Sequence, residues 1–292
     1  MKKLFLTSLV LLLSLFAGRS GSLTFTTYQR AGSSLSNNAV RKLYEDSRGF
    51  IWVGTHKGLN RYDGSRFKVY DRTDFGIESD FINVIREDLD GNLWIGTDNG
   101  VVIYRYSTDS FVRLRDFLKG GGTVSCPDDR IFAIERNSRG VMWISSRDGG
   151  LYSWNPQTGR LEHHPLSDGD TPLTNIFRIA VGSDDELFLA VYCDDIFRTD
   201  ARADSLSMLG AGTHPSWFAG DDIEGLVFAP DGKLYVAGNR TGLSEIDLVS
   251  SRVRTLWKQP HNHRSIALTM DRSGTLLLST TNFKSIYFLV NE

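Results

Sequence analysis

The sequence predicts an all-β protein made of repeated four-stranded antiparallel sheets, and three observations support this class. The segment DSRGFIWVGT at 46–55 returns 42 positions later as DLDGNLWIGT at 88–97. Weaker copies follow, and short runs rich in aromatic and β-branched residues alternate with Gly, Asp and Asn along the chain. A period of this length indicates stacked supersecondary units within one domain. The turn position of the repeat falls at Gly49, Gly91, Gly140, Asp185, Gly232 and Gly274.

The first full unit, residues 40–70, divides into four expected strands. The runs 40–45, 50–55, 59–62 and 66–70 have strand composition, and Gly- and Asp-containing turns separate them. The second run is apolar at successive positions, FIWV, which indicates that both of its faces are covered. Four-stranded sheets packed face to face around an axis meet this condition, and that arrangement is a β-propeller.

The later units have the same rhythm, and the last one is incomplete. It has three expected strands, whereas residues 23–28, LTFTTY, read as a strand without a unit of its own. The repeats therefore fit a closed six-bladed ring in which 23–28 completes the last blade, or an incomplete seven-bladed ring. The expected blades span about 40–70, 82–114, 130–163, 176–209, 223–256 and 265–290.

The repeated residues are expected to have structural roles. The turn glycines suit the positive φ of the hairpin between the first two strands. Trp52, Trp94 and Trp143 share one position inside an apolar strand, which favours packing between blades over a ring of sugar-stacking platforms.

The first residues indicate export. Lys2 and Lys3 precede an apolar run that is too short for a membrane span, and small residues follow it, as in a secretory signal peptide at 1–22. We therefore expect a periplasmic propeller at 23–292, without a membrane span in the mature chain. The net charge of −2, with no basic block, argues against nucleic acid as a partner. An oxidising compartment would permit a disulfide between Cys126 and Cys193, although unpaired thiols are the simpler expectation.

The segment LSNNAVRKLYEDSRGFIWVGTHKGLNRYDGSRFKVY resembles the two-component regulator propeller repeat, and FTTYQRAGSSLSNN resembles the start of the periplasmic sensor region of hybrid two-component histidine kinases. The resemblance is close over about 25–155 and weaker afterwards, where the Trp and the Gly-Thr pair are lost. It implies a sensor that detects oligosaccharides and controls glycan-utilisation genes. The chain lacks the second propeller, membrane span and kinase motifs of that family, which puts signalling by this chain alone in doubt.

Motifs for catalysis are absent, and no cofactor or metal site is expected. The sequence contains no G-x-S-x-G, H-E-x-x-H or phosphate-binding glycine loop. The paired carboxylates at 184–185 and 194–195 are explained by turns, and His261 and His263 lie in a loop without further ligands. We therefore expect a protein that binds rather than catalyses.

A binding face is expected where the loops between blades meet the turns between the second and third strands, because these lie at one end of a propeller. The loops at about 71–81, 115–129, 165–175, 210–222 and 257–264 are long, and aromatics beside Asn, Asp and Arg suit a carbohydrate. The candidate ligand-binding residues are Trp217, Phe218, Trp257, Tyr192, Arg147, Asp148, Asp98, Asn99, His56 and Arg240. The alternatives are a protein-interaction propeller, which would form a homodimer or bind a second propeller through a blade face, and a metal-assisted lyase or lactonase.

Overall fold

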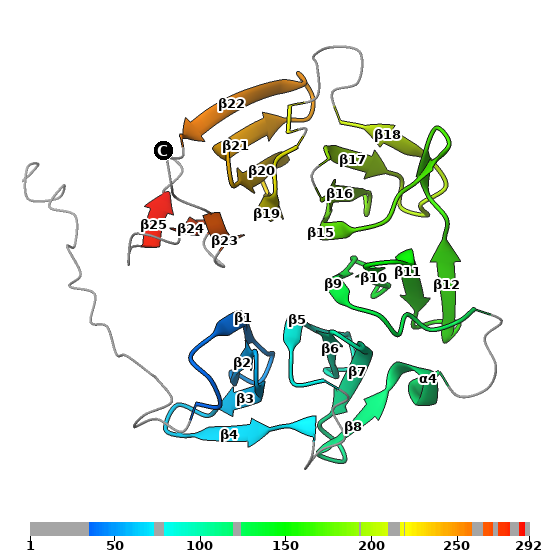
Figure 1. Cartoon of the computed structure of the whole chain (residues 1–292), viewed down its shortest axis with the longest axis vertical. Coiled ribbons are helices and arrows are strands. Elements are labelled where there is room, and N and C mark those ends of the chain that lie inside the picture. Colours follow the sequence, from blue (N-terminus) through cyan, green and yellow to red (C-terminus); the bar gives the residue numbers. More distant parts are fainter. Residues whose placement is uncertain are drawn as a thin grey trace, which may run out of the picture.

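The computed structural model describes residues 35–72, 79–118, 124–192, 194–209, 217–218, 220–258, 265–270, 274–280 and 286–289. Within these ranges the chain is a β-propeller whose blades are arranged around a common axis (Figure 1). The expected signal peptide and the expected closing strand at 23–28 lie outside the described residues. None of the described helices has the length and hydropathy of a membrane span.

Five blades are four-stranded antiparallel sheets in which each strand pairs with the next one along the chain. The sixth blade has three strands in the described residues. Blade one consists of β1 (Val40–Glu45), β2 (Ile51–Thr55), β3 (Gly58–Tyr62) and β4 (Phe67–Tyr70), and blade two of β5 (Ile82–Glu87), β6 (Leu93–Thr97), β7 (Gly100–Arg105) and β8 (Ser110–Arg113). Blade three consists of β9 (Ile131–Arg136), β10 (Met142–Ser146), β11 (Gly150–Asn155) and β12 (Arg160–His164), and blade four of β15 (Ile176–Val181), β16 (Leu187–Val191), β17 (Ile196–Thr199) and β18 (Leu206–Met208). Blade five consists of β19 (Ile223–Phe228), β20 (Lys233–Gly238), β21 (Gly242–Asp247) and β22 (Arg252–Trp257), and blade six of β23 (Ser265–Met270), β24 (Leu276–Thr280) and β25 (Ile286–Leu289).

Two of the expected loops contain regular structure. The helical turn α4 (Leu114–Phe117) follows blade two, and the short hairpin of β13 (Ser167–Asp168) and β14 (Thr171–Pro172) lies between blades three and four. Neither has the periodic pattern of a longer element, which is why loops were expected there from the sequence.

The first strand of each blade lies next to the axis, and all six of these inner strands share one irregularity (Figure 1). Near its start each inner strand has one residue that is left out of the pairing with the second strand. A β-bulge of this kind re-aims a side chain and bends the strand. The bulged residues are Arg41, Asn83, Phe132, Phe177, Glu224 and Ile266.

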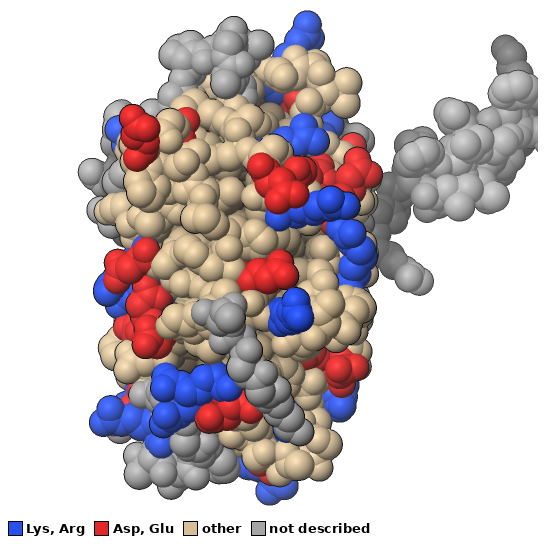
Figure 2. All heavy atoms as spheres, turned by 90° about the vertical axis from the view of Figure 1, so that its right-hand side faces the viewer, with Lys and Arg blue, Asp and Glu red and all other residues tan. Residues whose placement is uncertain are grey.

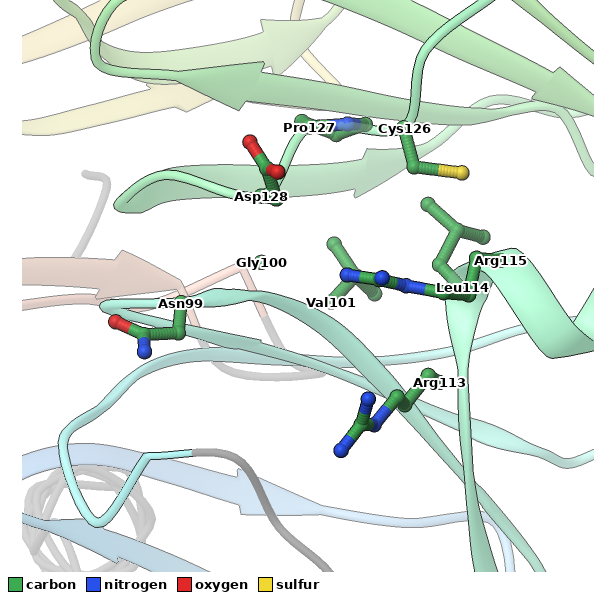
Figure 3. Close-up of a pocket in the computed structure, with 9 residues that line it drawn as sticks. All are labelled: Asn99, Gly100, Val101, Arg113, Leu114, Arg115, Cys126, Pro127 and Asp128. Atoms are coloured by element: carbon green, nitrogen blue, oxygen red, sulfur yellow. The ribbon is translucent and has the colours of Figure 1, made fainter.

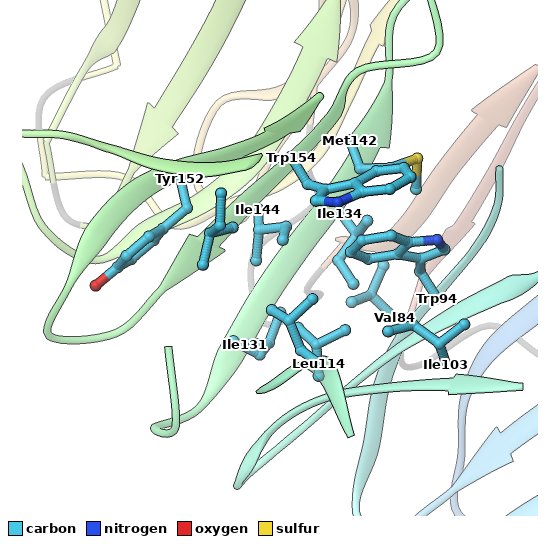
Figure 4. Close-up of a cluster of buried hydrophobic side chains, with 12 residues drawn as sticks. Val84, Trp94, Ile103, Leu114, Ile131, Ile134, Met142, Ile144, Tyr152 and Trp154 are labelled. Atoms are coloured by element: carbon cyan, nitrogen blue, oxygen red, sulfur yellow. The ribbon is translucent and has the colours of Figure 1, made fainter. Parts of the chain in front are cut away.

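Apolar clusters join each described pair of consecutive blades, five clusters in all. Between blades two and three, Trp94 packs on Trp154 with ring centroids 4.9 Å apart, and Met142 lies beside them (Figure 4). Trp52 and Trp94 are 0% exposed and Trp143 is 2% exposed. The three tryptophans therefore lie in the packing between blades, where their position in the repeat led us to expect them.

An aspartate in the first turn holds the tryptophan of the same blade. The Trp52 indole N–H donates to Asp46 at 2.6 Å, and the Trp94 indole N–H donates to Asp88 at 2.9 Å. The same carboxylates accept backbone N–H groups of their own turns. Blade three has Asn137 at this position, and neither the Asn137 amide nitrogen nor the Trp143 indole nitrogen has a hydrogen-bond partner among the described residues.

In blades one and two, the glycine of the Gly-Thr pair leaves room for the approach of the next blade. A Cβ on Gly54 would lie 2.6 Å from Ile82 Cγ2, and a Cβ on Gly96 would lie 2.7 Å from Ile131 Cγ2. Ile82 and Ile131 begin the inner strands of the following blades. The glycine at this position thus allows two inner strands to pack closely at the axis.

Blade one differs from the blades after it in its exposure. Val40 is 45% exposed and Leu43 is 62% exposed, although their equivalents in blade two, Ile82 and Ile85, are both 0% exposed. No apolar cluster among the described residues joins blade six to blade one. The choice between a six-bladed and a seven-bladed ring therefore stays a prediction.

On the side of the propeller that Figure 2 shows, many charged side chains lie toward its two ends. In Figure 2, which shows the molecule from the side of β12 and β18, Lys, Arg, Asp and Glu lie mainly along the two edges of the view. The band between them is mostly uncharged. Charged residues also lie on the outer strands, for example Arg160 and Glu162 of β12 and Arg252 and Arg254 of β22.

Candidate functional site

One end of the propeller, which we call the upper face, brings together residues from three kinds of position. The inner strands begin there, with their bulged residues, and the turns between the second and third strands lie there because strands alternate in direction. Backbone hydrogen bonds link these turns to the next blade: Gly58 N donates to Asp80 O at 2.8 Å, and Gly100 N donates to Asp129 O at 2.9 Å. The upper face is thus a connected surface.

Asp98, in the second turn of blade two, is held by two neighbours. Arg130 binds it in a bidentate manner, with both N···O distances 2.9 Å, and the Asn83 amide donates to it at 2.8 Å. Burial raises the pKa of Asp98, but the hydrogen bonds from Arg130 and Asn83 outweigh burial, so the pKa lies below its usual value. Asp98 is therefore a fixed carboxylate in its charged form.

Blade three continues this polar surface. The backbone N–H of Asp148 donates to the Asp129 carboxylate at 2.6 Å, and the backbone N–H of Arg147 donates to the Arg130 carbonyl at 2.9 Å. The Arg147 and Asp148 side chains, 50% and 70% exposed, pair with each other at 3.2 Å. Their backbone is fixed, while their charged groups face solvent.

Three aromatic rings lie in a row across blades three and four. Phe132 and Phe177, the bulged residues of β9 and β15, have ring centroids 4.4 Å apart. Phe177 stacks on Tyr192 at 4.8 Å, and Tyr192 is 48% exposed. The row is joined to the polar surface through the backbone, because Tyr192 N donates to Asn175 O and Asn175 N donates to Arg147 O.

The upper face therefore brings together four of the residues expected from the sequence, Asp98, Arg147, Asp148 and Tyr192. Arg130, Asn83, Phe132 and Phe177 also lie on this face and were not expected from the sequence. The aromatic and polar residues at the bulge position would have been visible if the inner strands had been aligned on their turns. The bulge itself has no signal in one sequence.

Of the other expected residues on this face, His56 and Arg240 lie apart from that group, and Asn99 follows Asp98 in the same turn. His56 packs against Phe81, with ring centroids 5.2 Å apart, between blades one and two. Arg240 belongs to a turn in blade five, where its backbone N–H donates to the buried Asp221 carboxylate at 2.8 Å. Asn99 lines a shallow pocket with Cys126 and Asp128 (Figure 3).

That pocket has room for about one water molecule, so it is not a ligand cavity. Cys126 is half-buried in it, and burial raises the pKa of its thiol. Cys126 forms no disulfide with a described residue, and Cys193 lies outside the described residues.

Three expected aromatic residues have a different role in the structure. Phe218 is 2% exposed within the apolar cluster between blades four and five, which rules it out as an exposed stacking platform in this structure. Trp217 packs against the same cluster. Trp257 ends β22, the outer strand of blade five, and packs between blades five and six. The loop position suggested exposure, but apolar loop residues here cover the core.

A group of charged residues on the inner strands was not expected from the sequence. We call it the axial charge group; it consists of Lys42, Arg86, Glu135, Arg178 and Glu224. Arg86 pairs with Glu135, and Arg178 pairs with Glu224 at 2.8 Å. Burial and the nearby charges of Arg86 and Arg178 lower the pKa of Lys42 to about 8, against a smaller opposing effect of Glu135.

No group of three or more His, Cys, Asp or Glu residues with the geometry of a metal site occurs among the described residues. The described histidines of blade three bind within their own sheet: His163 to Gly149 O at 2.7 Å, and His164 to Ser153 Oγ at 2.8 Å.

Comparison with known proteins identifies the repeat. Residues 34–57 and 76–99 match the family described as two component regulator propeller. These segments contain β1 and β2 of blade one and the equivalent strands of blade two. Blades one and two therefore carry the two component regulator propeller repeat. No curated protein matches the chain.

Solved structures with the same fold include extracellular domains of two hybrid two component systems from B. thetaiotaomicron. One is 20% identical to this chain, and the match covers 93% of this chain and 34% of that domain, with a TM-score of 0.72. The other is 19% identical, covers 87% and 34%, and has a TM-score of 0.71. The chain thus spans about a third of these domains. Virginiamycin B lyase from Staphylococcus aureus is 14% identical, with coverage of 86% and 84% and a TM-score of 0.65. At these identities the likeness shows the propeller fold.

Proposed function

We propose that this chain is an exported, ligand-binding propeller of a two-component type sensor, and that it binds an oligosaccharide on its upper face. The regulator repeat in blades one and two and the fold shared with extracellular sensor domains support the first part. The observation that carries the second part is the row of Phe132, Phe177 and Tyr192 on the same face as the held carboxylate of Asp98.

The row offers what a sugar requires. A half-exposed aromatic ring can stack on the C–H face of a pyranose, and Tyr192 is the ring of the row that is most exposed. Asp98 and Asn83 are fixed by hydrogen bonds, so they lose little conformational entropy when they bind a hydroxyl. Arg147 and Asp148 present exposed donors and acceptors on a backbone that is already ordered. These groups suit a neutral or weakly charged saccharide several rings long.

Signalling would follow from a further step. A ligand on the upper face contacts the starts of several inner strands, and so it can favour one relative arrangement of the blades. Coupling of that arrangement to a kinase, and through the kinase to glycan-utilisation genes, would depend on parts of a sensor outside the region that this chain spans. The export to the periplasm that this role requires rests on the signal-like segment at 1–22.

Isothermal titration calorimetry with a panel of plant and host oligosaccharides tests the proposal. We expect saturable binding of at least one of them, weakened about tenfold by Tyr192→Ala, since a central stacking residue contributes more than about 1 kcal/mol. Tyr62→Ala is the matched control: Tyr62 is a half-buried tyrosine at the opposite end of blade one, bonded to Gly64 O. Binding that Tyr62→Ala weakens and Tyr192→Ala does not would refute the site.

A protein-interaction role is a second candidate, and a different observation favours it. Val40 and Leu43 form an exposed apolar face on blade one, whereas the equivalent residues of blade two are buried. A second copy of the chain placed against this face would bury both side chains. Sedimentation velocity should then show a dimer that Leu43→Lys dissociates; a monomer at all concentrations would exclude it.

A further inference from the structure

The axial charge group contains more cations than carboxylates. Lys42, Arg86 and Arg178 come from β1, β5 and β15, whereas its carboxylates are Glu135 on β9 and Glu224 on β19. Arg41, the bulged residue of β1, adds a further positive charge whose field reaches Arg178. The described inner strands also carry Glu45, Glu87 and Arg136, so their five cations exceed their four carboxylates by one positive charge.

Each guanidinium of the group has one carboxylate partner. Arg178 donates to the Glu224 carboxylate at 2.8 Å, to the Glu224 carbonyl at 2.9 Å and to the Phe177 carbonyl at 2.8 Å. Arg86 donates to Glu135 through one terminal nitrogen. About a third of each of the Arg86 and Arg178 side chains is exposed, so solvent and solutes can reach them.

Two donors of the group remain without a partner among the described residues. No carboxylate of the described chain lies within ion-pair distance of the Lys42 ammonium, although the charges of Arg86, Glu135 and Arg178 all act on it. The Arg86 Nε atom is buried and has no hydrogen-bond partner. A buried N–H that is left unpaired costs about 1–3 kcal/mol, so a retained one calls for a partner.

We propose that the axial charge group is a binding site for a small oxyanion, a sulfate, phosphate or carboxylate group, held by Lys42 and Arg86 with Arg178 nearby. Such an anion supplies the missing negative charge. Its oxygens can accept hydrogen bonds from an ammonium and a guanidinium at the same time. Hydrogen bonds between a cationic donor and an oxyanion are among the strongest in proteins. The shared chemistry is the oxyanion itself, whether it arrives as a free ion or as the acidic group of a sugar.

This site adjoins the proposed saccharide site, because Arg178 follows Phe177 on β15 and donates to the Phe177 carbonyl at 2.8 Å. Lys42 and Arg86, which hold the anion, belong neither to the aromatic row nor to the turns of the upper face. The inference does not rest on oligosaccharide binding, and each site can be lost without the other.

The test uses the full chain with inorganic sulfate, inorganic phosphate and glucuronate, and with glucose as the uncharged counterpart of glucuronate. Titration calorimetry at constant ionic strength in chloride should show saturable binding of at least one oxyanion and none of glucose. Binding of glucuronate would identify a sugar carboxylate as an accepted source, and binding of sulfate or phosphate alone would identify a free ion. Absence of saturable binding for all three oxyanions overturns the proposal.

Variants show whether the anion binds at the axial charge group. Lys42→Gln should weaken binding at least tenfold, and Lys68→Gln should not, because Lys68 lies on the outer strand β4 and pairs with Asp109 at 2.9 Å. Glu135→Gln should tighten binding, since it removes the carboxylate that competes for Arg86. Glu135→Gln also tests whether the anion binds at the axial charge group if Lys42→Gln fails to fold. Unchanged binding in Lys42→Gln, or weakened binding in Glu135→Gln, contradicts the site.

Discussion

Blades one and two carry the same repeat and match the same family, yet their inner strands differ in burial. Leu43 is 62% exposed, and the equivalent Ile85 is 0% exposed. Ile85 packs with Trp52, Leu59 and Tyr70 of the preceding blade. In the described residues, no such cluster covers Leu43. The difference shows that the repeat determines the blade, whereas the preceding blade determines whether its inner strand is buried.

A second difference separates blades two and three. Asp88 accepts the indole N–H of Trp94 and two N–H groups of its turn, while Asn137 presents an amide nitrogen that finds no partner in the described chain. A single change from carboxylate to amide therefore leaves two donors unpaired. The repeat tolerates this change because packing between the blades still buries Trp143.

The largest expected effect concerns the inner strands. Ile85→Ala should lower the free energy of unfolding by about 2–5 kcal/mol, because it leaves a cavity in the cluster between blades one and two. Leu43→Ala should change it by less than about 0.5 kcal/mol, since an exposed side chain loses little packing. Urea unfolding followed by tryptophan fluorescence measures both. If Leu43→Ala proved as costly as Ile85→Ala, the face of blade one would have to be covered in solution.

The aspartate-to-tryptophan bond should have an effect of intermediate size. Asp88→Asn should destabilise the chain by about 1–3 kcal/mol, because it places an amide donor against the Trp94 indole N–H. Asn137→Asp should stabilise it by about 1 kcal/mol, because the new carboxylate accepts the bond from Trp143. Thermal unfolding of the two reciprocal variants checks the signs. Destabilisation by Asn137→Asp would mean that burial of the added charge outweighs the new hydrogen bond.

A smaller effect is expected from pH through Lys42, on which Arg86, Glu135 and Arg178 act. Its pKa falls from 10.5 to about 8 on folding, chiefly because of burial. Between these values the unfolded chain binds a proton that the folded chain does not, so stability falls as pH decreases through this window. Lys42→Met should therefore stabilise the protein more at pH ~7.5 than at pH ~9.5, as measured by urea unfolding in sulfate-free buffer. An equal effect at both pH values would show that the lysine is not perturbed.

The sequence predicted the fold because each blade depends on local signals. The turn glycines have positive φ, as Gly49 at 83° and Gly91 at 79° show, and the apolar second strands lie between sheets. The site was predicted in part. Turn residues such as Asp98 and Tyr192 were expected because loops carry function, but Phe132 and Phe177 reach the same surface through a bulge, which shifts side chains without a sequence signal.

The axial charge group was missed for a related reason. Lys42, Arg86 and Arg178 lie far apart in the sequence, and Lys42 and Arg86 each have a charged neighbour in their own strand. No local pattern therefore marks them, and they come together only because the inner strands share one axis. Phe218 shows the opposite limit: a loop aromatic looks exposed in the sequence, but the structure uses it to cover the core.

Hydrogen–deuterium exchange with and without a saturating oligosaccharide tests the central claim, that ligands bind where the inner strands begin. We predict slower exchange at 80–83, 130–133, 175–178 and the turn at 147–149, with no change at the turns 46–49 and 88–91 of the opposite end. Protection confined to those opposite turns, or to the outer strands, would contradict the account.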